Sequence, residues 1–338
     1  MRLFLLFFLL LTSDVLAQIR ITDVPSRIGS IMTNNPAGTD VSSAGNTFQV
    51  TTDSIFIAHV TGNTLQAVSY NGISGGDESL AIYGLLDGGF VVRENVVNFS
   101  IYDSFGALIT SISNSSNSEE GESISELAMD PNGKTIVFYT ATIIQSGKKG
   151  SVARVVQGNK AVGFYYDDAR EISTVEVSQN GELIGIINHR DGEDYQVQIF
   201  DRFGNEISTI SFDREIKGVT FSDNGLNATV FSSGRVGVYT LKNANRIAST
   251  SFRGGNLIRA AFFPEENTIV GVLGDMNENR VQDMKIRAVN IKSRTIKEQP
   301  YREALMYSPV VDIMLVRDRA YSYRINGFSR ELSIDITF

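Results

Sequence analysis

The chain has 338 residues, a formal net charge of −8 and no cysteine. A nucleic-acid-binding protein usually carries a basic face, so this acidic balance argues against nucleic acid as a partner. The lack of cysteine excludes a disulfide framework, and a hydrophobic core must therefore hold the fold. The aromatic residues are 20 Phe and 12 Tyr without any Trp, which suits a β-rich core.

The first 17 residues have the pattern of a secretory signal peptide. Arg2 supplies a positive charge, Leu3 to Leu11 form an unbroken apolar run, and Val15-Leu16-Ala17 resembles a cleavage site. The apolar run is about half as long as the roughly 20 residues that a membrane-spanning helix needs. The sequence therefore predicts an exported chain, periplasmic or extracellular, whose mature part begins near Gln18 and has no transmembrane segment.

A short motif repeats along the chain. Three windows align without gaps, namely Leu127 to Gly133, Val175 to Gly181 and Val219 to Gly225, and Ala261 to Asn267 is a degenerate copy. Their last residues are 48, 44 and 42 positions apart, which is the period of a β-propeller blade. The first three windows end in Asn-Gly, the dipeptide that a type I′ hairpin turn prefers, so each window predicts a strand followed by that turn.

The residues after each turn predict three further strands and hence a four-stranded antiparallel blade. The pattern expected for the third strand recurs seven times, which predicts an all-β, seven-bladed propeller over residues 48–338. Residues 18–47 are poorly patterned, and a strand from this N-terminal segment is one way to complete the short last repeat. We expect blade boundaries near residues 80, 124, 172, 216, 257 and 304. The third-strand pattern is centred near Val68, Tyr102, Val155, Phe200, Tyr239, Val289 and Ile325.

The connections between second and third strands indicate which face of the propeller functions. Residues 142–150, 188–194 and 274–283 predict long, varied loops, and binding residues commonly lie on such loops. The connections between blades lie on the same face and place an Arg before four successive inner strands, with tyrosines nearby that would favour a partner surface if they are exposed. The candidate ligand- or partner-binding residues are Arg170, Arg214, Arg253, Arg302, Tyr165, Tyr166 and Tyr301.

Two interpretations of these arginines stay open. Guanidinium groups at the mouth of a central channel suit a carboxylate, phosphate or sulfate. Alternatively, each Arg pairs with its neighbour Glu171, Glu215 or Glu303, or with a carboxylate of the next blade, and only stabilises the fold.

No catalytic constellation is evident. The two histidines, His59 and His189, have no second ligand at metal-binding spacing, and the chain contains no G-x-S-x-G or H-E-x-x-H motif. Paired carboxylates from distant blades stay an alternative, because two acids that act together need not be close in sequence. We therefore name no catalytic residue.

The segment Gly274 to Asp283 places Asp275, Asn277, Asn279 and Asp283 at relative positions 1, 3, 5 and 9. This pattern resembles the calcium-binding hairpin loop of integrin-type and FG-GAP propeller blades. The resemblance implies that these four side chains and the Val281 carbonyl hold a weakly bound, structural Ca²⁺. Arg280 departs from the pattern, which has Gly at that position for a sharp turn, so a plain hairpin turn is the alternative.

Over roughly residues 45–338 the repeats resemble exported bacterial WD40-like and TolB-like seven-bladed propellers. The resemblance rests on the strand, Asn-Gly turn, strand pattern and on the pairs Tyr102-Asp103 and Phe200-Asp201. It implies a non-catalytic binding or scaffold module that engages a protein, peptide or glycan through its long-loop face. A hydrolase or lyase acting on an extracellular polymer or lactone, built on the same scaffold, is the alternative.

Overall fold

The computed structural model describes residues 19–25, 30–32, 39–43, 46–50, 54–59, 65–69, 81–85, 89–94, 96–114, 125–277, 280–302, 305–306, 313–315, 320–326 and 330–338. The proposed signal peptide, residues 1–17, lies outside these residues, as do Asn279 and Glu303. Within the described residues there is no α-helix, and the only helical turn is the 3-10 turn Pro264–Glu266.

The described strands form seven antiparallel sheets. In pairing order, the first sheet is β3 (Thr39–Ser43), β4 (Asn46–Val50), β5 (Ser54–His59) and β6 (Leu65–Ser69), and the second is β7 (Ala81–Gly84), β8 (Phe90–Arg93), β9 (Asn98–Tyr102) and β10 (Leu108–Ser113). The next three are β11 (Ser125–Met129), β12 (Ile136–Gln145), β13 (Lys148–Gln157) and β14 (Lys160–Asp167); β15 (Glu171–Val177), β16 (Leu183–Arg190), β17 (Glu193–Asp201) and β18 (Glu206–Ser211); and β19 (Gly218–Phe221), β20 (Asn227–Phe231), β21 (Arg235–Thr240) and β22 (Arg246–Ser251). The sixth is β23 (Leu257–Phe263), β24 (Thr268–Asn277), β25 (Arg280–Asn290) and β26 (Thr295–Pro300), and the last is β28 (Ile313–Leu315), β29 (Ser322–Asn326), β30 (Arg330–Ile336) and β1 (Ile19–Pro25). Two short strands extend this set, because β2 (Ser30–Met32) pairs with β7 and β27 (Leu305–Met306) pairs with β25.

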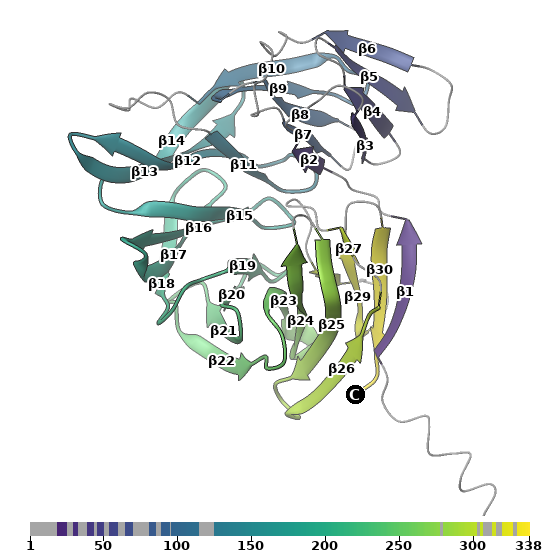
Figure 1. Cartoon of the computed structure of the whole chain (residues 1–338). Helices are drawn as coiled ribbons and strands as arrows, with labels where there is room; N and C mark the ends of the chain where they lie inside the picture. Colours follow the sequence, from purple (N-terminus) through teal and green to yellow (C-terminus); the bar gives the residue numbers. More distant parts are fainter. Residues whose placement is uncertain are drawn as a thin grey trace, which may run out of the picture.

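The sheets stand around a common centre. In Figure 1, β11, β15, β19 and β23 lie toward the middle of the molecule, whereas β18, β22 and β26 lie on the outside. This arrangement confirms the prediction of an all-β propeller made of antiparallel sheets. The strands β1, β2 and β3 come from the N-terminal segment 18–47, and β1 is the outer strand of the last sheet, where Ile19 lies opposite Ile336.

The expected third strands agree with the structure in five sheets and differ in two. Tyr102, Val155, Phe200, Tyr239 and Val289 lie on β9, β13, β17, β21 and β25, each the third strand of its sheet. Val68 lies on β6, the fourth strand, and Ile325 lies on β29, the second. Those two assignments were wrong because both sheets draw a strand from the N-terminal segment, β3 in one and β1 in the other, where the sequence pattern is weak.

Adjacent sheets are held together by shared hydrophobic clusters. Phe99 of β9 stacks on Phe138 of β12 with ring centroids 4.1 Å apart, and both are fully buried. Between the sheets that begin with β23 and β28, the rings of Phe263 and Tyr323 lie 4.6 Å apart. Burial of alternate Val, Ile and Phe side chains along each strand therefore fixes both the register of a sheet and its neighbours.

The repeated Asn-Gly turns form, but not as type I′ turns. Only the glycines Gly133, Gly181 and Gly225 have positive φ, at 68°, 68° and 67°, whereas a type I′ turn needs positive φ at both central residues. The Gly133 N–H donates to the carbonyl of Asp130 at 3.0 Å, so Pro131 and Asn132 are the central residues. The proline ring fixes φ near −65°, which suits the first central position of a type I turn with Gly following it.

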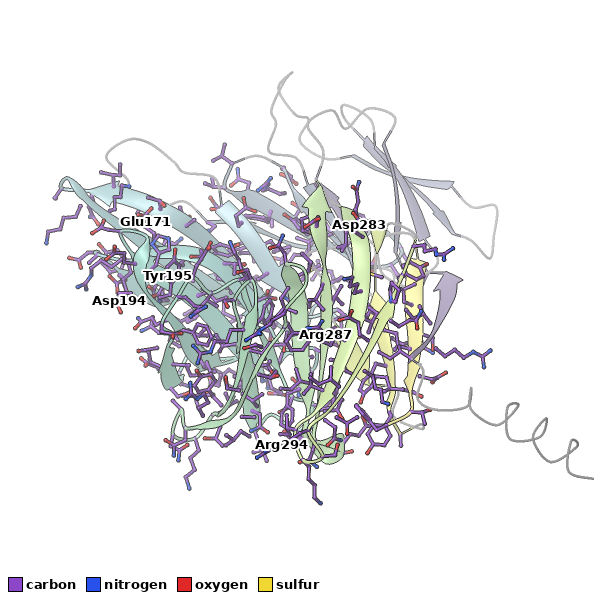
Figure 2. All side chains as sticks on the ribbon, turned by 60° about the horizontal axis from the view of Figure 1, so that its bottom comes forward. Glu171, Asp194, Tyr195, Asp283, Arg287 and Arg294 are labelled. Atoms are coloured by element: carbon purple, nitrogen blue, oxygen red, sulfur yellow. The ribbon has the colours of Figure 1, made fainter. Side chains whose placement is uncertain are left out.

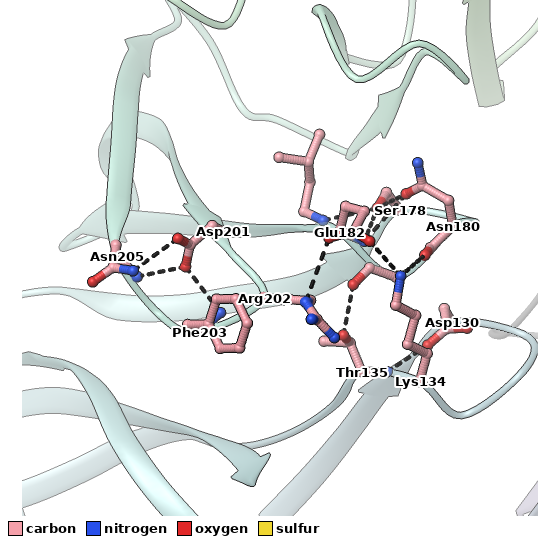
Figure 3. Close-up of polar contacts among 12 residues, drawn as sticks. Asp130, Lys134, Thr135, Ser178, Asn180, Glu182, Asp201, Arg202, Phe203 and Asn205 are labelled. Atoms are coloured by element: carbon pink, nitrogen blue, oxygen red, sulfur yellow. Dashed lines mark hydrogen bonds and ion pairs between the residues drawn. The ribbon is translucent and has the colours of Figure 1, made fainter.

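A side chain at the start of each turn accepts hydrogen bonds from backbone N–H groups in or just after the turn. The Asp130 carboxylate accepts from the N–H groups of Thr135 at 2.6 Å and Asn132 at 3.0 Å. Ser178 and Ser222 do the same in the next two sheets, accepting from the N–H groups of Leu183 at 2.9 Å and Asn227 at 3.0 Å. These turns also touch one another, since the Thr135 hydroxyl donates to the Gly181 carbonyl at 2.6 Å (Figure 3).

Candidate functional site

Two of the three predicted long loops, residues 142–150 and 188–194, are extended hairpins instead, and the third, residues 274–283, lies in the hairpin β24–β25 that its pattern predicted. Strands β12 and β13 run on to a two-residue turn at Ser146-Gly147, where φ is 53° and 74°, and β16 and β17 run on to Asp191-Gly192, with 50° and 75°. Both pairs have the positive φ values of a type I′ turn. The expectation of irregular loops was wrong because the backbone bonds of these polar segments are satisfied by continued strand pairing. Hairpins β12–β13, β16–β17 and β24–β25 define what we call the hairpin face.

The hairpin face is opposite the Asn-Gly turns. In Figure 2, Glu171, Asp194 and Asp283 lie toward one end of the strands, and Arg294, in the turn between β25 and β26, lies at the other. Candidate residues from the sequence lie on the connections at the hairpin face, and their surroundings differ greatly from one another.

Arg170 is a structural residue of this face. It is 8% exposed, and its guanidinium forms an ion pair with Asp194 while also donating to the Asp194 carbonyl at 2.8 Å and to Asn188 Oδ1 at 3.2 Å. Glu171 is not its partner, because that carboxylate accepts from the Thr142 hydroxyl at 2.7 Å. Arg170 therefore joins the start of β15 to the hairpin β16–β17 of the same sheet.

The other three arginines are exposed. Arg214 Nε lies 3.6 Å from Asp213 Oδ1, and Arg253 and Arg302 are also exposed. Glu215 pairs with Lys217, at 2.6 Å, rather than with Arg214. A ring of four equivalent guanidinium groups is therefore not formed, since one of the four is buried in an ion pair.

The tyrosines also differ from one another. Tyr165 is buried on β14 and accepts from Asn188 Nδ2 at 3.2 Å, and burial raises the pKa of its hydroxyl to about 12. Tyr166 is 58% exposed and donates to Gln145 Oε1 at 2.9 Å. Tyr301 is partly buried against the core that includes Tyr323. Only Tyr166 offers most of its ring to a partner.

The proposed calcium segment forms the tip of hairpin β24–β25. Asp275 lies opposite Gln282, and Asn277 lies opposite Arg280. Asp275 Oδ1 accepts from Asn256 Nδ2 at 3.0 Å, Val281 is buried, and Asp283 has φ 46° beside a shift in register. Because Asn279 lies outside the described residues, the ligand set is incomplete and the calcium site stays a prediction.

A central pocket of about 680 Å³ lies among the inner strands. That volume lies in the range of small-molecule pockets. Pro131 and Gln179 line it at the end with the Asn-Gly turns, and Ser233, Asn256 and Met276 line it at the hairpin face. The pocket therefore runs along the inner strands from one face to the other, and none of the seven arginines and tyrosines predicted from the sequence lines it.

Two carboxyl groups line the wall of the central pocket, and their interactions with arginine differ. Glu176 of β15 accepts from Arg259 of β23 through both oxygens, at 2.5 Å and 2.9 Å. Glu126 of β11 lies 3.5 Å from Arg93, and burial raises the pKa of its carboxyl although the positive charge of Arg93 opposes that shift. A carboxyl in a cavity whose pKa is raised by burial is a candidate proton donor or acceptor.

The hydroxyl of Tyr139 lines the same wall and is nearly inaccessible to water, which raises its pKa above the ordinary value. Tyr139 therefore stays neutral and serves as a hydrogen-bond donor. The residues of this wall escaped the sequence analysis, although Glu176 stands inside a repeated window and Glu126 directly precedes one. A charged residue within an apolar inner strand was the signal that could have found them.

Comparison with known proteins supports the fold. No protein-family model matches the chain, and no curated protein matches it in sequence. Two similar solved structures are titled "Crystal structure of the eukaryotic initiation factor" and "Crystal Structure of Mitotic Checkpoint Complex". The first has a TM-score of 0.52 at 14% identity, and the alignment covers 77% of this chain but only 63% of the other. The second has a TM-score of 0.51 at 12% identity and covers 94% and 91%.

These likenesses support a β-propeller and, at such low identity, concern the fold alone. The part of the chain that the structure describes contains no helix long and apolar enough to cross a membrane.

Proposed function

We propose that this chain is an exported, non-catalytic β-propeller module that engages a protein, peptide or glycan through its hairpin face. The pattern of residues 1–17 supports export, and the net charge of −8 argues against nucleic acid as the partner. The observation that carries the proposal is that three long hairpins project on one face, and that Met276 of hairpin β24–β25 also lines the central pocket. A rigid scaffold with projecting hairpins presents a defined surface at little cost in conformational entropy.

Exposed side chains on this face provide contacts. Tyr166 is 58% exposed on β14 and Met276 is 49% exposed on hairpin β24–β25. Aromatic residues and Met are enriched in protein interfaces. The ion pair between Arg170 and Asp194 stiffens the hairpin β16–β17, so that this part of the surface is formed before a partner arrives.

The test is capture of a partner from an envelope extract on immobilised mature protein, with and without calcium, followed by variants on both faces. We expect Met276→Asp to reduce capture about tenfold or more, since an interface residue of this kind contributes at least 1 kcal/mol. Phe203→Ser, at a residue 56% exposed in the turn between β17 and β18 at the opposite end, is the control and should capture as well as the wild type. Equal capture by both variants would remove the hairpin face as the binding surface.

A second candidate function is a hydrolase or lyase that acts on an extracellular polymer or lactone in the central pocket. The observation that favours it is the raised pKa of Glu126, a carboxyl that lines the pocket together with Glu176. If the chain shows such an activity, Glu126→Gln should abolish it and leave the thermal unfolding midpoint within a few degrees of the wild type. An activity that survives this substitution would not belong to the pocket.

A further inference from the structure

A second, smaller cavity lies on the outside of the molecule, between the sheet β15–β18 and the sheet β19–β22. Its volume is about 180 Å³. One wall is the end of β18 and the residues after it, and the other is the pair of outer strands β21 and β22. The lining residues are Ser211, Phe212, Asp213, Arg235, Gly237, Tyr239, Arg246 and Ser249.

Strand geometry brings these groups to one surface. Arg235, Gly237 and Tyr239 alternate along β21 and therefore share a face of the sheet. The register of β22 places Ser249 opposite Gly237 and Arg246 opposite Tyr239. Gly237 forms the floor, and a Cβ at this position would lie 2.7 Å from the ring of Tyr239, so no larger residue fits while the ring stays where it is.

The charges in and around this cavity favour an anion. Arg235 Nη1 pairs with Asp213 Oδ2 at 3.0 Å, and Asp213 also lies 3.6 Å from Arg214. Arg246 lies beside Tyr239, and its charge acts to lower the pKa of the Tyr239 hydroxyl. The lining thus holds two guanidinium groups and one carboxylate, with Arg214 beside it, which leaves an excess of positive charge on a chain whose net charge is −8.

Hydroxyl groups complete the set of donors. Burial raises the pKa of Tyr239 despite the nearby Arg246, so its hydroxyl keeps its proton at neutral pH and is able to donate while it accepts from Arg246. Ser249 is exposed at the edge of the cavity. The cavity of about 180 Å³ has room for about six waters at roughly 30 Å³ each. That space is too small for a drug-sized ligand and sufficient for a small anion.

We propose that this cavity binds a tetrahedral oxyanion, phosphate or sulfate, through the guanidinium of Arg246 and the hydroxyls of Tyr239 and Ser249. Arg235 contributes charge from the other end, where its ion pair with Asp213 offsets part of that charge. Guanidinium groups and hydroxyls are the donors that such oxyanions prefer. The proposed donors Arg246, Tyr239 and Ser249 lie on the outer strands β21 and β22 and not on the three hairpins, so either proposal stands or fails without the other.

The test measures binding of inorganic phosphate and of sulfate to the full mature protein by calorimetry and by the thermal unfolding midpoint. Sodium chloride at the same ionic strength corrects for general screening. Both oxyanions should raise the midpoint above that in chloride. Methyl phosphate distinguishes the source of the group, because a site for an esterified phosphate should bind it at least as well as the free anion.

Three variants test whether Arg246 and Asp213 determine the binding of the anion. Arg246→Gln should weaken binding about tenfold, the effect of losing one charge-assisted hydrogen bond, whereas Arg294→Gln, which removes an exposed charge from a turn of another sheet, should leave it unchanged. Asp213→Asn should tighten binding because it removes the one negative charge. A wild-type midpoint equal in phosphate, sulfate and chloride would overturn the proposal, and so would equal binding by the Arg246 and Arg294 variants.

Discussion

Arg259 of β23 and Glu176 of β15 join two sheets that are not neighbours. Their side chains are 12% and 17% exposed and meet through two hydrogen bonds of 2.5 Å and 2.9 Å along the central pocket. The sheet that begins with β19 stands between them, so the pair ties three consecutive sheets together at the centre of the propeller.

Loss of one partner of this pair should be costly. We expect Arg259→Met to lower the free energy of unfolding by about 3 kcal/mol or more, because Glu176 is left as an uncompensated, mostly buried charge. The double variant Arg259→Met with Glu176→Leu should recover most of that loss. Urea unfolding measures both. The control is Lys217→Gln, which breaks an exposed pair with Glu215 and should cost less than about 1 kcal/mol.

The carboxyl of Glu126 should make stability fall as pH rises. Its pKa is raised above the ordinary value of 4.5 by burial, so between the unfolded and folded pKa values the folded state binds more protons. Stability therefore decreases as pH increases from about 4.5 upward through the folded pKa. Denaturant unfolding of the wild type and of Glu126→Gln, measured from acid to neutral pH, tests this. As pH rises, the free energy of unfolding of the wild type should fall relative to that of the variant.

Asp201 supplies the opposite case. Burial acts to raise its pKa, but hydrogen bonds from the Asn205 side chain and from the N–H groups of Asn205, Phe203 and Gly204 together lower it. Its contribution is therefore lost as pH falls through the folded pKa, and Asp201→Asn should shift with the opposite sign to Glu126→Gln. Parallel pH dependence in the two variants would contradict both assignments.

Two glycines in equivalent turns should differ in their tolerance of alanine. Gly225 has φ 67° and open space around a Cβ, so Gly225→Ala should cost only the left-handed backbone conformation, about 1 kcal/mol. Gly181 has φ 68°, but a Cβ there would lie 3.0 Å from Asp130 Oδ1 in the neighbouring sheet. Gly181→Ala should cost at least about 1 kcal/mol more, as overpacked sites do. Equal losses in thermal or urea unfolding would mean that the neighbouring turns do not press on one another.

The arginines of the hairpin face should separate into structural and dispensable residues. Arg170→Gln removes the buried partner of Asp194 and should lower stability by about 3 kcal/mol. Arg253→Gln, at an exposed position, should change stability by less than about 0.5 kcal/mol. If the two variants unfold at the same urea concentration, Arg170 does not hold its hairpin.

Calcium should stabilise the mature protein if the tip of β24–β25 binds it. A site with Kd of about 10⁻⁴ to 10⁻³ M would contribute about 1 to 3 kcal/mol at roughly 10 mM calcium, which corresponds to a rise of a few degrees in the unfolding midpoint. Asp275→Asn combined with Asp283→Asn should abolish the rise. If calcium does not change the unfolding midpoint of the wild type, the segment is a plain hairpin.

Local chemistry explains which features could be predicted from the sequence. The turns at Gly133, Gly181 and Gly225 depend on a few adjacent residues, so their positions and the strands around them were recognisable, and with them the fold class. The turn type was predicted wrongly because the residues before Asn-Gly, such as Pro131, also decide the backbone conformation. Residues 142–150 and 188–194 were predicted as loops because their polar sequences lack the alternation of a strand, whereas their backbone N–H and C=O groups pair with a neighbouring strand in the structure.

The central pocket depends on contacts between distant parts of the chain. Arg259 and Glu176 are 83 residues apart, and Arg93 approaches Glu126 from a different sheet. No spacing rule relates such residues. Likewise, the four regularly spaced arginines share a position in the repeat, but Arg170 is buried in an ion pair with Asp194 of the hairpin in its own sheet, whereas Arg214 and Arg253 are exposed.

The pairing of β1 with β30 has a consequence for the order in which the molecule assembles. Ile19 lies opposite Ile336, so this sheet is complete only after β30 has been made. Until then, the side of β23 to β25 that packs on β29 and β30, with Val272, Val281 and Ile286 in its core, has no cover. Contacts between such distant segments form slowly, and this apolar surface is therefore the part of the newly made chain most in need of protection from aggregation.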